Sequence, residues 1–371
     1  MTPVNLERLN LGGYSAEPTQ YELPDTAKPA DVRLIEANRM LNFMVTATDV
    51  DPDLTVALAV ETYADPGGPF KTPALPEKYR PVMADNKLIA GTYFARTDGN
   101  KRTPQKLIAA IYRFPTDQAA RAAAEQMDRI SYEGEESRRP VRLDGHPDIK
   151  ASIKDDLSAI AVATRGPYVT LINYGASQPD QTSVTKTLEK GVADQLAKLD
   201  QLKPTPLEDI LDTPIDPDGI MRRALPKSPT YSDPFTSELD FHAYSPAGEL
   251  AFERNQALMK AAFAESGVDL VGRRYSVVYR TKDLASAFHL QSALVTLGHN
   301  DERIESPPGL ADTRCIRLYE VDEIRHYQAM CAVVHGRYVG VVVAPQKLAG
   351  KVDPTLYERA AAQYAVLAKS E

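Results

Sequence analysis

The sequence contains no tryptophan, only two cysteines and only six histidines among its 371 residues. These histidines and cysteines are too few and too scattered for a rich metal centre, and we expect no metal and no other cofactor. No apolar run approaches the roughly 18 residues that span a bilayer, so we expect no transmembrane segment. Acidic residues outnumber basic ones by 51 to 43, and the net charge of −8 argues against a nucleic-acid partner.

Common catalytic motifs are also missing, including G-x-S-x-G, the P-loop, G-x-G-x-x-G and H-E-x-x-H. Ser183-Val184-Thr185-Lys186 matches the S-x-x-K pattern of penicillin-binding proteins, in which the lysine activates the serine nucleophile. The S-D-N and K-T-G partners of that pattern are absent. We therefore interpret Ser183 as the N-terminal capping residue of a helix and assign no catalytic residue.

The composition is ordinary for a globular protein, with 43% hydrophobic and 25% charged residues. Two proline-containing stretches divide the chain. Residues 1–29 contain four prolines and predict an extended N-terminal arm, and residues 203–234 contain seven and predict a linker. A first α+β unit is expected over residues 30–202 and a second over residues 235–371. Helices are expected at 30–48, 117–127, 184–202, 246–266, 283–297 and 354–369, and strands at 88–96, 106–113, 149–154, 158–164, 168–174, 273–280, 313–320, 327–334 and 338–344.

The two units repeat short patterns in the same order. Ile111-Tyr112-Arg113 recurs as Val278-Tyr279-Arg280, at an offset of 167 residues, and the turn at Gly166 recurs at Gly336, at an offset of 170. Several matches in one order indicate an internal duplication.

A further match sets a different offset. Glu36 and Asn38 match Glu253 and Asn255 at an offset of 217 residues. The difference from 167 predicts that the first unit carries an insertion of 50 residues, at about residues 50–105.

Each unit contains a three-strand meander whose short connections force antiparallel pairing. The expected fold class is therefore α+β. We expect two duplicated units, each an antiparallel sheet packed with helices on one side, related by a pseudo-two-fold axis.

Cys315 and Cys331 are predicted to form a disulfide. Both lie on expected strands and are equidistant from Glu323, so a hairpin centred there places them face to face. Facing residues at a non-hydrogen-bonded pair are about 4.5 Å apart at Cα, which a disulfide can span. The alternative is two small buried thiols. We favour the disulfide, because an exported chain would oxidise such a pair.

The repeated pairs Tyr112-Arg113 and Tyr279-Arg280 are the candidate ligand-binding residues. A tyrosine beside an arginine can bind an anionic or sugar-like group through ring stacking and the guanidinium fork. The alternative, which we prefer, is that the tyrosine is half-buried and the arginine caps the next helix or pairs with an aspartate, Asp117 or Asp283.

The opening segment, Leu9-Asn10-Leu11-Gly12-Gly13-Tyr14-Ser15-Ala16-Glu17-Pro18, resembles the L-D-x-G-x-Y-P-T-x-P start of a lipoprotein family of uncharacterised function from mycobacteria, nocardiae and related actinobacteria. Residues 33–44 and the following Val50-Asp51-Pro52 are similar to its second characteristic block, while Asn10 and Ser15-Ala16 depart from the pattern. The resemblance covers the chain in two parts and implies an exported protein, lipidated on a cysteine just upstream of this arm. At the level of fold, the units also resemble the extracellular sensor domains of mycobacterial serine/threonine kinases.

These observations lead to one expected function and two alternatives. We expect the extracytoplasmic part of a cell-envelope lipoprotein, attached to the membrane only through a lipid anchor upstream of this sequence. It would bind a small hydrophobic or cell-wall ligand, without catalysis, in a groove between the two units. The alternatives are an envelope hydrolase that uses Ser183 and Lys186, and a structural module that binds another envelope protein.

Overall fold

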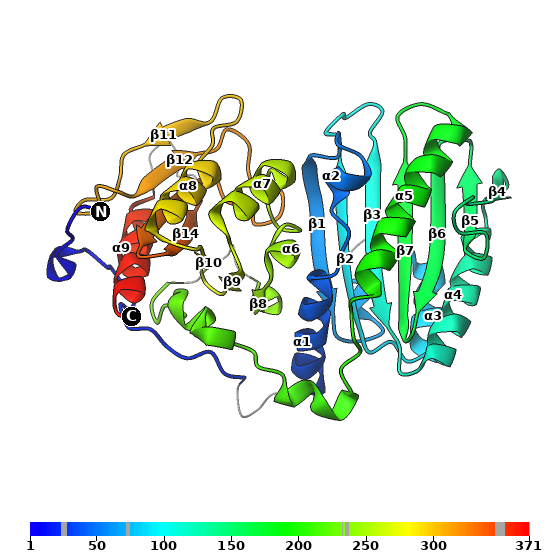
Figure 1. Cartoon of the computed structure of the whole chain (residues 1–371), viewed down its shortest axis with the longest axis horizontal. Coiled ribbons are helices and arrows are strands. Elements are labelled where there is room, and N and C mark those ends of the chain that lie inside the picture. The colour runs from blue at the N-terminus through cyan, green and yellow to red at the C-terminus, as the bar shows by residue number, and fades with distance from the viewer. Residues whose placement is uncertain (24–27, 72–74, 232, 234–236, 346–352, 371) are drawn as a thin grey trace. The chain divides into compact units, whose positions relative to one another are not determined.

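The computed structural model describes residues 1–23, 28–71, 75–231, 233, 237–345 and 353–370. The chain forms two compact units. The N-terminal unit comprises Pro24–Thr213 and Leu250–Ala257, and the C-terminal unit comprises Met1–Leu23, Pro214–Glu249 and Leu258–Glu371. Both units contain helices and an antiparallel sheet, which confirms the predicted fold class (Figure 1).

The sheet of the N-terminal unit has seven strands in the order β1-β2-β3-β7-β6-β5-β4, and every neighbouring pair is antiparallel. Its strands are β1 (Val56–Tyr63), β2 (Ala90–Thr97), β3 (Lys106–Arg113), β4 (Arg138–Val141), β5 (Lys150–Lys154), β6 (Ser158–Arg165) and β7 (Tyr168–Gly175). Its helices are α1 (Pro29–Leu41), α2 (Ala47–Val50), α3 (Arg80–Asp85), α4 (Asp117–Ser131) and α5 (Gln181–Leu199).

Helices cover both faces of this sheet, not one face as expected. Leu171 and Ile172 are adjacent on β7 and therefore point to opposite faces. Leu171 belongs to the buried cluster that includes Ala120 and Met127 of α4. Ile172 lies against Gly191 of α5. The unit is therefore a three-layer sandwich, with α4 behind the sheet and α5 in front of it in Figure 1.

The sheet of the C-terminal unit also has seven antiparallel strands, in the order β11-β12-β13-β14-β10-β9-β8. Its strands are β8 (His242–Tyr244), β9 (Leu270–Arg273), β10 (Val277–Arg280), β11 (Glu302–Ile304), β12 (Arg314–Arg317), β13 (Ala329–His335) and β14 (Tyr338–Ala344). Its helices are α6 (Pro246–Glu249), α7 (Gln256–Ser266), α8 (Leu284–Leu294) and α9 (Pro354–Ala368), and both α8 and α9 pack against β13 and β14.

The two sheets share one strand order, because each strand of the first corresponds to the strand numbered seven higher in the second. This agrees with an internal duplication, and the pseudo-two-fold axis stays a prediction. The stretch at 50–105 is not an insertion outside the repeat. It supplies β1 and β2, which correspond to β8 and β9. The offset of 217 paired Glu36 and Asn38 of α1, which precedes β1, with Glu253 and Asn255, which follow β8. These residues therefore do not occupy corresponding places in the two units.

Two expected elements of the second half are each divided in two. The helix expected at 246–266 is α6 and α7, with residues 250–255 between them, and the strand expected at 273–280 is β9 and β10, joined by a tight turn. Residues 250–257 complete the N-terminal unit. Arg96 on β2 is fully buried there and donates hydrogen bonds to the carbonyl oxygens of Leu250, Ala251 and Glu253.

The expected N-terminal arm is an integral part of the C-terminal unit. Leu9 lies in the buried cluster of that unit, and the Tyr14 hydroxyl accepts a hydrogen bond from Arg359 Nε at 2.6 Å. Gly13 passes so close to Thr230 that a Cβ would lie 1.9 Å from its Oγ1, so only glycine fits. The L-N-L-G-G-Y motif therefore has a structural reason, which is docking of the arm.

The expected linker at 203–234 is largely structured where it is described. It contains the short 3-10 helices η4 (Leu207–Asp212), η5 (Pro217–Gly219) and η6 (Met221–Arg223), and Met221 is fully buried in the C-terminal unit. Residues 232 and 234, at the end of the expected linker, lie outside the described residues.

Candidate functional site

Tyr112 and Arg113 end β3 and point to opposite faces of the sheet. Tyr112 is fully buried in the cluster between the sheet and α4. Its hydroxyl has no hydrogen-bond partner among the described residues, and burial raises its pKa well above the ordinary value. The Tyr112 ring is therefore packed in the protein core and is not accessible to a ligand.

Arg113 forms a buried ion pair with Glu36 of α1, in which Arg113 Nη1 lies 2.7 Å from Glu36 Oε1. The two side chains are only 5% and 1% exposed. Glu36 also accepts hydrogen bonds from Arg39 Nε, at 2.8 Å, and from the Tyr168 hydroxyl, at 3.1 Å. Arg113 Nη2 donates to the carbonyl oxygen of Thr205. The guanidinium thus joins β3 to α1 and to the segment after α5, while its Nε has no hydrogen-bond partner among the described residues.

Sequence reasoning missed Glu36 as the partner of Arg113. Glu36 lies four residues before Met40, which belongs to the apolar face of the helix, and both side chains are buried. A carboxylate in the apolar stripe of an amphipathic helix needs a buried cation, and this signal could have identified the pair.

Tyr279 and Arg280 occupy the corresponding place at the end of β10. Tyr279 is buried, with its hydroxyl 3.5 Å from Oε1 of the buried Glu249. Arg280 Nε lies 2.7 Å from Asp269 Oδ1, and Arg280 Nη1 lies 2.8 Å from Asp218 Oδ2. The next helices are capped by Thr116 and Asp283. Among the described residues, the ion-pair partners of the two arginines are Glu36, Asp269 and Asp218. The preferred alternative of a helix cap or a pair with Asp117 or Asp283 was therefore wrong.

Ser183 and Lys186 lie on the exposed first turns of α5. The capping residue is Asp180 and not Ser183, because the Asp180 side chain accepts a hydrogen bond from the Ser183 backbone N–H at 3.0 Å. Within the described ranges, no hydrogen bond joins the Ser183 hydroxyl to the Lys186 amine, so the structure offers no activated nucleophile here.

Cys315 and Cys331 form the predicted disulfide. They are directly opposed on β12 and β13, and both are buried against α9. The corresponding pair in the first sheet is Ala151 and Ala161, which face each other on β5 and β6.

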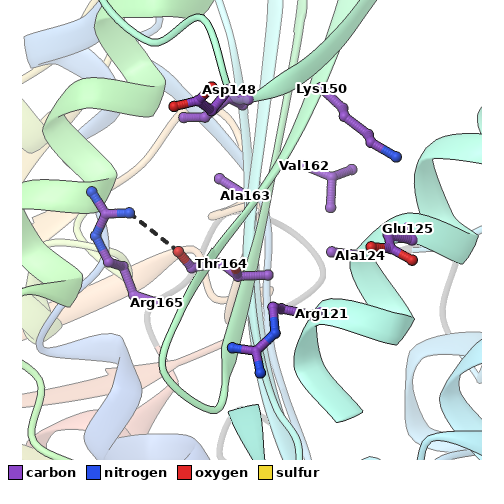
Figure 2. A pocket seen from close by; sticks show the side chains of 10 residues that line it. Arg121, Ala124, Glu125, Asp148, Lys150, Val162, Ala163, Thr164 and Arg165 are labelled. Carbon is purple, nitrogen blue, oxygen red and sulfur yellow. Dashed lines mark hydrogen bonds between the residues drawn. The ribbon is translucent and has the colours of Figure 1, made fainter. Parts of the chain in front are cut away.

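A surface pocket of about 260 Å³ opens on the N-terminal unit between α4 and the ends of β5 and β6 (Figure 2). Small side chains lie at its base, including Ala124 on α4 and Val162, which faces Lys150 across the β5–β6 pair. Five charged residues line it, three basic and two acidic. They are Arg121, Lys150, Arg165, Glu125 and Asp148. The Arg165 side chain lies on the other side of β6 from those of Arg121 and Glu125 (Figure 2).

The charged groups of the pocket differ in the ion pairs and hydrogen bonds that they form with the rest of the protein. Arg165 Nε lies 2.9 Å from Asp200 Oδ1, and Arg165 Nη1 donates to the Thr164 carbonyl oxygen at 3.2 Å, as drawn in Figure 2. Lys150 Nζ lies 3.8 Å from Asp128 Oδ2. The side chains of Arg121, Glu125 and Asp148 have no ion pair in the part of the chain that the structure describes. Sequence reasoning did not identify this pocket, because its residues come from three separate segments.

The described residues contain neither a metal-binding cluster nor a membrane-spanning helix. Within the described ranges, no three His, Cys, Asp or Glu side chains gather closely enough to hold a metal ion. No helix in the described part of the chain has the length and apolar character needed to cross a membrane.

Comparisons with known proteins give a family and one structural likeness. No curated protein matches this chain. A solved structure that matches is the crystal structure of the extracellular domain of PknH from Mycobacterium tuberculosis, at 13% identity, covering 41% of this chain and 93% of that one. Its TM-score of 0.26 is too low to establish a common fold. Residues 23–215 match the N-terminal domain of unknown function DUF7373, and residues 220–370 match the C-terminal one. The chain therefore belongs to the two-domain DUF7373 family.

Proposed function

We propose that this chain is the extracytoplasmic part of a lipid-anchored cell-envelope protein that binds a ligand without catalysis. The observation that carries the proposal is the buried Cys315–Cys331 disulfide. Structural disulfides persist in oxidising compartments and are rare in the cytosol, where thiols are kept reduced. A disulfide inside the core of the C-terminal unit therefore supports a site of action outside the cytoplasm.

The lipid anchor is proposed upstream of residue 1, in an actinobacterial envelope, on the resemblance of the opening segment. The docked arm supports this arrangement, because Tyr14 and Gly13 fix the chain after the anchor against the C-terminal unit. Metabolic labelling of the full-length protein with an alkyne fatty acid, followed by envelope fractionation, tests the anchor. Label in the envelope fraction, lost when the upstream cysteine is changed to serine, is the expected result. Unlabelled protein in the cytosol would overturn the localisation.

The non-catalytic role is supported by the local structure around the candidate residues. Tyr112 and Tyr279 are buried, Arg113 and Arg280 are held by carboxylates, and Ser183 has no base within the described contacts. Labelling with a fluorescent penicillin and a fluorophosphonate tests the hydrolase alternative. We expect no labelling, whereas labelling that Ser183→Ala abolishes would establish a serine hydrolase instead.

The ligand is proposed to be a polar cell-wall component in preference to a lipid. The pocket beside α4 supports this choice, because five of the ten residues that line it are charged. Mass spectrometry of extracts from protein purified out of its native envelope provides the test. A bound polar cell-wall fragment is expected. Recovery of a stoichiometric lipid, with a thermal shift on adding it back, would overturn the preference, and a protein partner recovered by cross-linking would favour the structural module.

A further inference from the structure

We infer that the pocket between α4 and β6 binds a small zwitterion, a molecule with one carboxylate and one ammonium group, of the class of free amino acids and the termini of short peptides. This inference rests on the proposed binding function and names its ligand class. The pocket is lined by Arg121, Glu125, Asp148, Lys150 and Arg165, and their formal charges sum to +1.

The volume of the pocket limits the size of the group that it can enclose. Pockets for drug-sized ligands usually enclose about 300–1,000 Å³ and are mostly apolar. This one measures about 260 Å³ and is rimmed by charge. Ala124 creates the space at its base, because it stands on the pocket side of α4 where a longer side chain would fill the gap. A single amino-acid-sized group fits such a space, which is too small to enclose an acyl chain or a long polymer segment.

The cationic side of the pocket can receive a carboxylate. The Arg121 guanidinium has no carboxylate partner among the described residues, and its planar fork can donate two parallel hydrogen bonds to a carboxylate. Lys150 is 3.8 Å from Asp128, too far for a hydrogen bond, so its ammonium group can turn towards a ligand. Arg165 is different, because Asp200 and the Thr164 carbonyl already hold it. Arg165 contributes positive electrostatic potential while it keeps these two contacts.

The anionic side of the pocket can receive an ammonium group. Glu125 lies one helical turn after Arg121 on the same face of α4, whereas the Asp148 carboxylate, in the loop before β5, points away from Glu125 (Figure 2). A simple anion beside Arg121 would meet the Glu125 carboxylate, and a simple cation beside Glu125 would meet Arg121 and Lys150. A zwitterion gives each kind of charge an opposite partner, and this is why we assign it in preference to a singly charged ligand.

Titration of the whole, oxidised protein by two-dimensional NMR tests the assignment. The probes are alanyl-alanine, N-acetyl-alanine with only the carboxylate, alanine amide with only the ammonium group, and glucose. We expect saturable shifts of the amides of Ala124, Val162 and Thr164 with alanyl-alanine. Each singly charged analogue should bind about tenfold more weakly, the loss expected for one charge-assisted hydrogen bond.

Three variants connect the shifts to the pocket. Arg121→Glu removes the carboxylate partner, and Ala124→Leu fills the space, so both should abolish saturation with alanyl-alanine. Arg129→Glu is the matched control, because Arg129 is an exposed arginine on the same helix that does not line the pocket. It makes the same charge change and should leave the affinity unaltered. Circular dichroism and absence of free thiols verify that each variant is folded and oxidised.

Three results would overturn the inference. The first is the absence of saturable shifts with alanyl-alanine at millimolar concentration. The second is equal binding of N-acetyl-alanine, which would make the pocket a simple anion site. The third is an affinity that Arg121→Glu and Ala124→Leu leave unchanged. Each of these refutes the pocket alone, because a ligand recovered from native envelopes would still support the proposed binding function. A cytosolic, reduced protein would refute that function independently of the titration.

Discussion

Arg113 and Glu36 form an ion pair that is removed from solvent, with their nearest nitrogen and oxygen atoms 2.7 Å apart. At the corresponding place in the second sheet, Arg280 pairs with Asp218, whose side chain is 67% exposed. Glu36 lies on α1, which precedes β1, and Asp218 lies on η5, which precedes β8. The two units thus contain the same kind of contact, one in the protein interior and one at its surface.

This difference predicts unequal effects of neutralising the two acids. Glu36→Gln should lower the free energy of unfolding by about 3–5 kcal/mol, because it leaves Arg113 as an uncompensated cation in the interior and removes the partner of the partly exposed Arg39. Asp218→Asn makes the same chemical change at the surface and should cost much less, because solvent screens an exposed ion pair. Urea denaturation of both variants measures the difference, and equal losses would contradict the structural assignment of Glu36.

Tyr112 predicts the unusual case of a buried hydroxyl whose removal does no harm. Because its oxygen has no partner among the described residues, Tyr112→Phe should be neutral or stabilising by up to about 1–3 kcal/mol, the penalty of an unsatisfied buried group. Tyr168→Phe is the control, since its hydroxyl donates to Glu36 at 3.1 Å and its loss should cost about 1.5–3 kcal/mol. Thermal melts of the two variants should therefore move in opposite directions or by clearly different amounts.

Reduction of Cys315–Cys331 should lower the melting temperature modestly without unfolding the protein. A loop of about 15 residues allows up to roughly 3 kcal/mol of stabilisation, and a hairpin held by ladder hydrogen bonds realises less.

The double variant Ala151→Cys/Ala161→Cys should form a second disulfide, because the facing register is the same. Thiol titration of the unfolded, non-reduced proteins checks both points. Two free thiols in secreted wild-type protein would contradict the bond.

Asp240 predicts a specific pH dependence of stability. Burial raises the pKa of Asp240 to about 6, against the opposing charges of Arg273 and Arg325. The folded protein therefore holds this proton more tightly than the unfolded chain, and the stability that results is complete below about pH 4 and is lost as the pH rises to about 6. Asp240→Asn removes this loss.

The measurement is the free energy of unfolding of wild type and Asp240→Asn between pH 4 and pH 7. The stability of the variant relative to wild type should increase across this interval, by at most about 3 kcal/mol, which is the value of a shift of about two pKa units. A difference that stays constant over the interval would show that Asp240 titrates normally.

Much of the fold was predictable because the relevant patterns are local. The hairpin of β2 and β3, the meander of β5, β6 and β7, and the helix that begins after Thr116 follow from alternation, turn residues and a capping side chain. The same reasoning missed β1 and β4, and it missed β8 and β11, which have three residues each. Strands this short have no periodicity of their own and exist because a neighbouring strand offers hydrogen-bonding groups.

The candidate site was less predictable, because burial depends on what packs from elsewhere in the chain. Tyr112 and Arg113 were recognised as a repeated pair, but only the packing of α4 and α1 makes one a core ring and the other a buried ion-pair partner. The pocket beside α4 combines residues from a helix, a loop and a strand end, and no sequence pattern connects them.

The amino-acid sequence by itself determined the α+β class, the antiparallel meander of each unit and the pairing of Cys315 with Cys331. Residues that meet in a hairpin are close in sequence, so their alternation and the turn between them specify the contact. Tertiary structure alone decided that Glu36 lies against Arg113 and that Arg121 is left free of a carboxylate at the rim of a pocket. Such contacts join distant segments, and their electrostatics depend on how much solvent the surrounding layers exclude.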